Sequence, residues 1–138
     1  MPPHRHVIRV YYEDTDFSGS VYHASYLRFM ERGRTEFLRS LDIHQAEIHA
    51  GKAGPAFGFV VRAMKIDFLK PARMDDVIAV DTDVIRVGGA SAELEQRILR
   101  GGEVLVNAEV RVAAVANGRA FRLPPDIREK LRTVMLRG

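Results

Sequence analysis

The chain opens with apolar residues at every second position, namely Ile8, Val10 and Tyr12. This alternation predicts a half-buried strand over residues 7–13. After a turn-rich stretch, apolar residues recur at intervals of three and four, which predicts an amphipathic helix over residues 23–41. The other face of this helix carries six charged side chains and is expected to be solvated: Arg28, Glu31, Arg32, Arg34, Glu36 and Arg39.

The second half of the chain returns to a period of two after a loop near residues 51–58. Four strands are predicted there, over residues 57–69, 77–87, 90–100 and 103–116. The connections between them are short and two of them contain glycine pairs, so neighbouring strands should be antiparallel. Pro124 then begins a short helix that is expected to end near Met135.

The order of these elements keeps helices apart from an antiparallel sheet, which is typical of the α+β class. The 138 residues fit a single domain over residues 1–138. We expect one five-stranded antiparallel sheet wrapped around one long helix, with a short C-terminal helix. Val60, Leu105 and Val115 fall on the sheet face opposite the helix. That apolar face should pack against another subunit, so a homo-oligomer, either a dimer or a tetramer, is expected.

Composition excludes several classes of protein. Hydrophobic residues make up 46% of the chain and charged residues 28%, as in globular domains, so extended disorder is not expected. The absence of cysteine removes disulfides, thiolate metal ligands and cysteine nucleophiles, and is compatible with a cytoplasmic protein. No apolar run is long enough to span a membrane. No motif for a zinc site or a phosphate-binding loop is present, so neither a metal nor a cofactor is expected.

Positive charge is concentrated at the C-terminus, where residues 119–138 hold six Lys or Arg and two acidic residues. Such a segment attracts phosphates. It lacks the interleaved aromatic residues of single-strand binders, so a solvated helix face is favoured and nucleic acid is not expected as a partner.

Candidate chemistry gathers between the first strand and the long helix, in residues 11–23, which combine acidic side chains, tyrosines and His23. A helix N-terminus presents unpaired N–H groups that polarise a carbonyl oxygen. A nearby carboxylate can attack that carbonyl or activate water toward it. Acyl transfer is therefore the reaction class that these residues favour. The alternative is structural, with Asp14 and Asp16 only making side-chain turns.

Three stretches resemble the hotdog-fold acyl-CoA thioesterases, specifically the Tol-Pal-associated group of the 4-hydroxybenzoyl-CoA thioesterase-like family. They are Tyr12-Glu13-Asp14-Thr15-Asp16 with Gly19 and Val21-Tyr22-His23-Ala24-Ser25-Tyr26, then residues 29–39, then Phe68-Leu69-Lys70-Pro71. The chain departs from the family pattern in two places. Residues 17–20 are bulkier and more polar than usual, and Gly33 replaces a usual alanine. A helical glycine costs about 1 kcal/mol unless it permits close packing.

The resemblance implies that the chain hydrolyses acyl-CoA, with Asp16 as nucleophile or as general base for water. It implies that the backbone N–H of His23 polarises the thioester carbonyl, and that the side chains of His23 and Tyr12 shape the pocket. It also implies coenzyme A binding across a subunit interface by basic side chains, for which Lys70 and Arg73 are candidates, along with Lys65 and Arg86.

Other readings stay open at this stage. A second hotdog lineage places its carboxylate on the long helix, which nominates Glu31 or Glu36. A hotdog hydratase or dehydratase also uses an acid and a histidine. A third alternative is a non-catalytic acyl-thioester or protein-binding module, attached to an envelope complex through the basic C-terminal helix.

Overall fold

The computed structural model describes residues 2–135 and contains a curled antiparallel sheet around one long helix. The strands are β1 (His4–Arg9), β2 (Gly58–Phe68), β3 (Val77–Val87), β4 (Ser91–Arg100), β5 (Glu103–Ala116) and β6 (Arg119–Ala120). The helices are α1 (His23–Ser40), α2 (Gln45–His49) and α3 (Pro125–Thr133), with a 3-10 turn, η1 (Tyr12–Asp14). The predicted α+β class and the hotdog arrangement of an antiparallel sheet around one long helix are confirmed, but β6 makes the sheet six-stranded where five strands were predicted.

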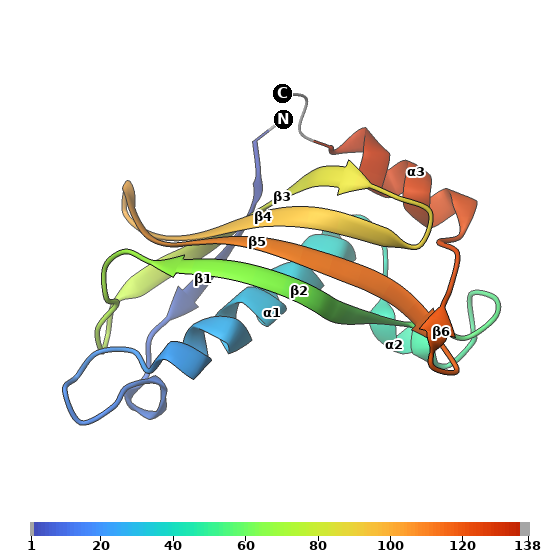
Figure 1. Cartoon of the computed structure of the whole chain (residues 1–138). Coiled ribbons are helices and arrows are strands. Elements are labelled where there is room, and N and C mark those ends of the chain that lie inside the picture. The colour runs from blue at the N-terminus through green and yellow to red at the C-terminus, as the bar shows by residue number, and fades with distance from the viewer. Residues whose placement is uncertain (1, 136–138) are drawn as a thin grey trace.

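The main strands lie in the order β1-β3-β4-β5-β2, and every pairing is antiparallel. The sheet curls over α1, and the connection between β1 and α1 lies at one end of that helix (Figure 1). This arrangement follows from the right-handed twist of strands and from the single apolar stripe of the helix. No helix in residues 2–135 is both long and apolar enough to cross a membrane.

The buried face of α1 is the one predicted from the spacing of apolar residues. Tyr26, Phe29, Met30 and Phe37 are all buried against the sheet. Gly33 lies at the closest approach, because a Cβ atom there would stand 2.6 Å from Val80 Cγ1. The glycine therefore does permit close packing of the helix on the sheet.

The first strand differs from its prediction over residues 7–13. It begins earlier, at His4, and ends at Arg9, after which the chain turns into η1. The carboxylate of Asp14 accepts a hydrogen bond from Tyr11 N–H, and this local bond competes with continued pairing on β3. Tyr12 consequently has 79% of its surface exposed and is not a half-buried strand residue.

Two short elements were not predicted, and one helix ends early. The five-residue α2 is too short to give a periodic signal, and β6 pairs only two residues with β5. Helix α3 ends at Thr133, two residues before the predicted end.

A β-bulge overturns the prediction that Leu105 faces away from α1. Ile98 pairs with Val106 and Leu99 pairs with Val104, so Leu105 has no partner on β4. An extra residue of this kind interrupts the alternation of side chains between the two faces. Leu105 is therefore fully buried in the core, whereas Val60 is exposed and Val115 half-buried.

The sheet face opposite α1 is largely charged along β4 and β5. Arg111 donates to Glu93 at 3.0 Å, and Arg97 pairs with Glu95 at 3.0 Å. Exposed apolar side chains gather instead on β2 and just after it, at Val60, Val61, Phe68 and Leu69. The unpartnered apolar surface thus follows an edge strand more than the sheet face that the sequence suggested.

Candidate functional site

The connection between β1 and α1 contains a tight turn over residues 16–20, which hydrogen bonds from and to the backbone of Asp16 close. Asp16 N–H donates to Ser20 O at 3.0 Å, and Gly19 N–H donates back to Asp16 O at 3.1 Å. Gly19 has a φ of +83°, which side chains disfavour and glycine adopts readily. Met74 N–H and Val21 N–H tie this turn to the neighbouring loop through Gly19 O and Ala72 O. The backbone around Asp16 is therefore fixed from both sides.

Asp14 is buried and holds the turn to the start of α1. Its carboxylate accepts the N–H of Tyr11 at 2.8 Å, and its carbonyl accepts the N–H of Tyr22 at 2.9 Å. Through these two bonds Asp14 links the backbone of Tyr11 to that of Tyr22, just before α1. The side-chain turn considered from sequence thus describes Asp14, and the bond from Ser18 N–H to Asp16 Oδ1 is a side-chain turn as well.

Asp16 differs from Asp14 because its carboxylate is exposed to solvent. The hydroxyl and the N–H of Ser18 both donate to Oδ1, the N–H at 2.8 Å. These bonds, with a smaller contribution from the nearby His23 imidazole, lower the pKa of Asp16 below its usual value. The side chain is accordingly a carboxylate at neutral pH, with Oδ2 left without a hydrogen bond within the described residues.

His23 is the first residue of α1, and no side chain caps this helix. The N–H groups of a first helical turn have no acceptor within the helix and carry a partial positive charge. The imidazole ring packs on Phe68 with centroids 4.5 Å apart, which fixes the side chain against the end of β2. Tyr26 also contacts Phe68 and accepts a hydrogen bond from Ala72 N–H at 2.8 Å.

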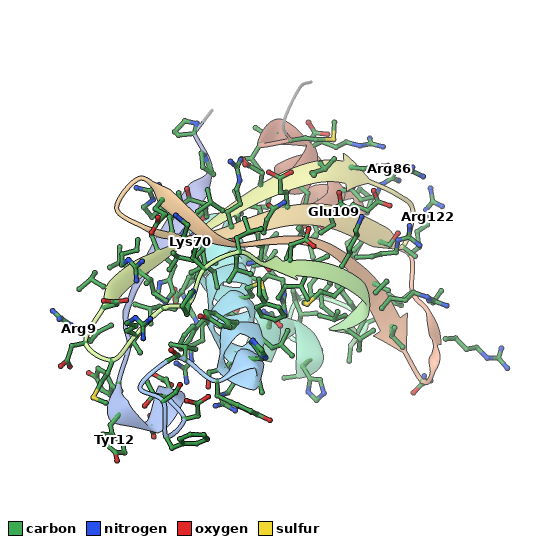
Figure 2. All side chains as sticks on the ribbon, turned by 60° about the vertical axis from the view of Figure 1, so that its left-hand side comes forward. Arg9, Tyr12, Lys70, Arg86, Glu109 and Arg122 are labelled. Atoms are coloured by element: carbon green, nitrogen blue, oxygen red, sulfur yellow. The ribbon has the colours of Figure 1, made fainter. Side chains whose placement is uncertain are left out.

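The hydroxyl of Tyr12 makes no hydrogen bond to Asp16 or His23 in the described structure. Figure 2 shows Tyr12 at the outer end of the connection, pointing away from the sheet. Its backbone carbonyl accepts both the N–H and the hydroxyl of Thr15, so its main chain stabilises the turn. Asp16 lies near enough to His23 for the imidazole to lower its pKa. The Tyr12 side chain is mostly exposed and bonds to neither of them within the described residues.

The two candidate coenzyme A cations have different surroundings. Lys70 Nζ donates to Glu103 at 2.6 Å, and Arg100 donates to both Glu103 and Asp76. The hydrogen bond from Lys70, followed by that from Arg100, lowers the pKa of Glu103. Arg73 donates to the Ser20 hydroxyl at 3.3 Å and so lies beside the turn.

The helix carboxylates nominated as alternatives lie farther along α1. Glu31 comes eight residues after His23, about 12 Å along the helix axis. Glu36 is half-buried and bonds to Arg39 at 3.3 Å. Residues 2–135 contain no cluster of three or more His, Cys, Asp or Glu side chains arranged for a metal ion.

Sequence reasoning missed the contact of Ser18 with Asp16, because Ser18 was regarded only as a departure in loop composition. A serine two positions after an aspartate is a recognised turn signal, since both side chains bond to local backbone. That spacing was the available clue to its contact with Asp16.

Comparisons with known proteins agree with the fold. The profile of the thioesterase-like superfamily matches residues 10–131. The acyl-CoA thioesterase YbgC of Haemophilus influenzae is 45% identical over 112 residues, covering 81% of this chain and 80% of its own length. The acyl-CoA thioester hydrolase YbgC of Escherichia coli O6:H1 is 44% identical over 109 residues, covering 78% of each chain. The crystal structure of a probable thioesterase from Bartonella henselae superposes with a TM-score of 0.85 at 45% identity, covering 88% of this chain and 99% of that one.

Proposed function

The chain belongs to the thioesterase-like superfamily as an acyl-CoA thioesterase, and we propose that Asp16 and the N-terminus of α1 carry out its reaction. Water and an acyl-CoA are converted to a free carboxylic acid and the thiol of coenzyme A. The C–S bond of the thioester breaks, a C–O bond forms, and the thiolate takes up a proton.

The observation that carries this proposal is the state of the Asp16 carboxylate. It is exposed, ionised and held by Ser18 through one oxygen, which leaves Oδ2 for the reaction. Two routes are open to it. As a nucleophile it attacks the thioester carbonyl and forms a mixed anhydride that water then hydrolyses. As a general base it removes a proton from the water that attacks.

The proposed partner of Asp16 is the open first turn of α1. The N–H of His23 would donate to the thioester oxygen, because that oxygen gains negative charge as the carbonyl is attacked. This role is supported by the absence of a side-chain cap on α1 and by the packing of His23 against Phe68. We assign the side chain of His23, held against Phe68, to the wall of the substrate site. Tyr12 is not assigned to that wall, because its side chain is 79% exposed and points away from the sheet.

For the phosphates of coenzyme A, we favour Arg73 over Lys70. Arg73 lies next to the turn through Ser20, whereas Lys70 already neutralises Glu103. A phosphate would have to displace that carboxylate to engage Lys70, which costs the existing ion pair.

We also propose that the chain is a homo-oligomer. Strand β2 pairs only with β5, and exposed apolar side chains line it and the residue that follows: Val60, Val61, Phe68 and Leu69. An exposed apolar edge strand is a ready template for pairing with a second copy. Light scattering across a range of concentrations would test this proposal.

The decisive experiment measures free thiol released from short-chain, long-chain and aromatic acyl-CoAs by wild type and Asp16→Asn. The substitution keeps the acceptor oxygen for Ser18 and removes only the charge, so the fold should be retained. We expect kcat to fall by about two orders of magnitude or more. The chain has no cysteine, so it adds no thiol background.

Glu13→Gln is the matched control, because it makes the same change at an exposed residue of the same connection. Asp14→Asn is less suitable, since the buried carboxylate clamps Tyr11 N–H. Equal losses in Asp16→Asn and Glu13→Gln would reject the assignment. If wild type binds every acyl-CoA and releases no thiol, the binding-module alternative replaces it.

A further inference from the structure

The connection between β2 and β3, residues 69–76, runs beside the turn that carries Asp16, and both lie at the same end of α1 (Figure 1). Val21 N–H donates to Ala72 O of this connection at 2.8 Å. The residue before it, Ser20, accepts the N–H of Asp16 on its carbonyl oxygen at 3.0 Å. A shift of the connection would therefore move the backbone that carries the Asp16 carboxylate.

Tyr26 holds the same connection from the side of the helix. Its hydroxyl accepts the N–H of Ala72 at 2.8 Å, and both residues are almost completely buried. The ring is fixed by its neighbours, since it packs edge-on against Phe29 and also contacts Phe68. Loss of the hydroxyl would leave a buried N–H without its hydrogen bond, which is costly and favours a displaced connection.

Tyr26 also belongs to the helical turn that begins with His23. The two residues are three positions apart on α1, and both rings contact Phe68, with centroids 4.5 Å away for His23 and 5.6 Å away for Tyr26. This turn of the helix thus presents the His23 N–H and, through Ala72, fixes the backbone at Asp16. Groups that react together must be held within about 0.5 Å of their productive geometry, so this link bears on the rate.

We propose that Tyr26 is a positioning residue, which sets the placement of the Asp16 carboxylate relative to the His23 N–H through its bond to Ala72. This role rests on the reaction proposed above. Tyr26 itself exchanges no proton with the substrate, because its hydroxyl is buried and engaged with a backbone N–H. Burial raises the pKa of its phenol, which accordingly stays protonated at neutral pH.

A matched control lies under the middle of α1. Thr82 on β3 is also almost completely buried, and its hydroxyl accepts a hydrogen bond from Gln96 Nε2 at 3.0 Å. Gln96 Nε2 also donates to Met30 O at 3.0 Å, and Gln96 Oε1 accepts from Arg34 at 3.0 Å. Arg34 was expected on a solvated helix face, but it is half-buried in this network. The network joins α1 to the sheet and makes no hydrogen bond to the connection before α1 among the described residues.

The test compares thiol release by wild type, Tyr26→Phe and Thr82→Val, since each substitution removes one buried hydroxyl and changes the side-chain volume little. We expect Tyr26→Phe to lower kcat about tenfold and to change KM less than about twofold, because the contact acts on the geometry of the reacting groups. Thr82→Val should keep the kcat of wild type, although both variants unfold at a lower temperature. The acid limb of the kcat/KM profile should not move in Tyr26→Phe, because Ser18 still donates to Asp16.

Amide hydrogen exchange gives a readout that does not depend on the reaction. In Tyr26→Phe the Val21 amide should exchange about tenfold faster than in wild type, whereas Thr82→Val should leave its rate unchanged. In wild type, the amides of Val21 and Ala72 should be protected to a similar degree, because one opening of the connection exposes both. This last comparison decides the matter if Tyr26→Phe does not fold, and a Val21 amide that exchanges as fast as an exposed one would overturn the proposal.

Three results in the variants would also overturn it. They are a wild-type kcat in Tyr26→Phe, an equal loss of kcat in Thr82→Val, and loss of the basic limb of the pH profile in Tyr26→Phe, which would make the phenol a reacting group. Failure of the proposed function is a different result. Wild type would then release no thiol from any acyl-CoA, and the role of Tyr26 in the reaction would fall with it.

Discussion

Substitution of Leu105 by alanine measures whether the β-bulge in β5 turns this residue into the core. Leu105 is fully buried, so Leu105→Ala removes apolar contacts and leaves space that neighbours fill only partly. Substitutions of this kind cost about 2–5 kcal/mol, and we expect about 3 kcal/mol here. If strict alternation held and the side chain faced solvent, the cost would be under about 0.5 kcal/mol.

Urea unfolding followed by circular dichroism gives the free energy of unfolding for each variant at one protein concentration. A loss of about 3 kcal/mol also lowers Tm by roughly 10 °C in a chain of this size. The matched control is Leu27→Ala, the same chemical change at a residue with 44% of its surface exposed and outside the proposed contact between copies, which should cost less than about 1 kcal/mol. Equal costs for the two variants would refute the proposed orientation of Leu105.

Three further substitutions test the hydrogen bonds described above. Ser18→Ala removes the main donor that lowers the pKa of Asp16, so the acid limb of the kcat/KM profile for thiol release should move to higher pH. An unchanged acid limb would show that Ser18 does not set the protonation of the reacting carboxylate. Gln96→Leu strands several buried polar groups and should cost about 2–4 kcal/mol in thermal unfolding, and a cost near zero would show that the network contributes little. The pKa of Glu103 is lowered by Lys70 and then by Arg100, and, against the effect of burial, Arg100 lowers the pKa of Asp76. Wild type should therefore lose stability as pH falls from about 4 toward the lowered folded values of these carboxylates. Over that pH range, Arg100→Met should lose less of its free energy of unfolding than the control Arg97→Met. An equal loss in the two variants would show that Arg100 does not lower the pKa values of these carboxylates.

Local patterns in the sequence determined most of the elements. The spacing of apolar residues predicted α1 to within one residue at its C-terminal end, and the period of two predicted β2 to β5 to within one residue. These patterns are reliable because each element buries one face, and burial acts on every residue of that face. The motif from Tyr12 to Tyr26 gave the family, which the comparisons confirmed.

Candidate site residues were predictable by type and less so by role. The sequence nominated Asp16 and His23 together, and the structure brings them to the same end of α1. It could not distinguish a buried clamp at Asp14 from an exposed carboxylate at Asp16, because both are aspartates in one turn-rich segment. Their difference arises from burial and from which backbone groups each carboxylate reaches.

Tertiary structure alone decided the remaining features. Pairing between β4 and β5 produces the bulge at Leu105, and no pattern within one strand records which residue its neighbour skips. Arg34 reads as a surface cation in sequence, yet it is half-buried and donates to Gln96, sixty-two residues away. The sequence by itself determined the elements and the chemistry of one loop, because those depend on neighbours along the chain. The curl of the sheet over α1 decided which polar groups became buried, because that depends on contacts between distant segments.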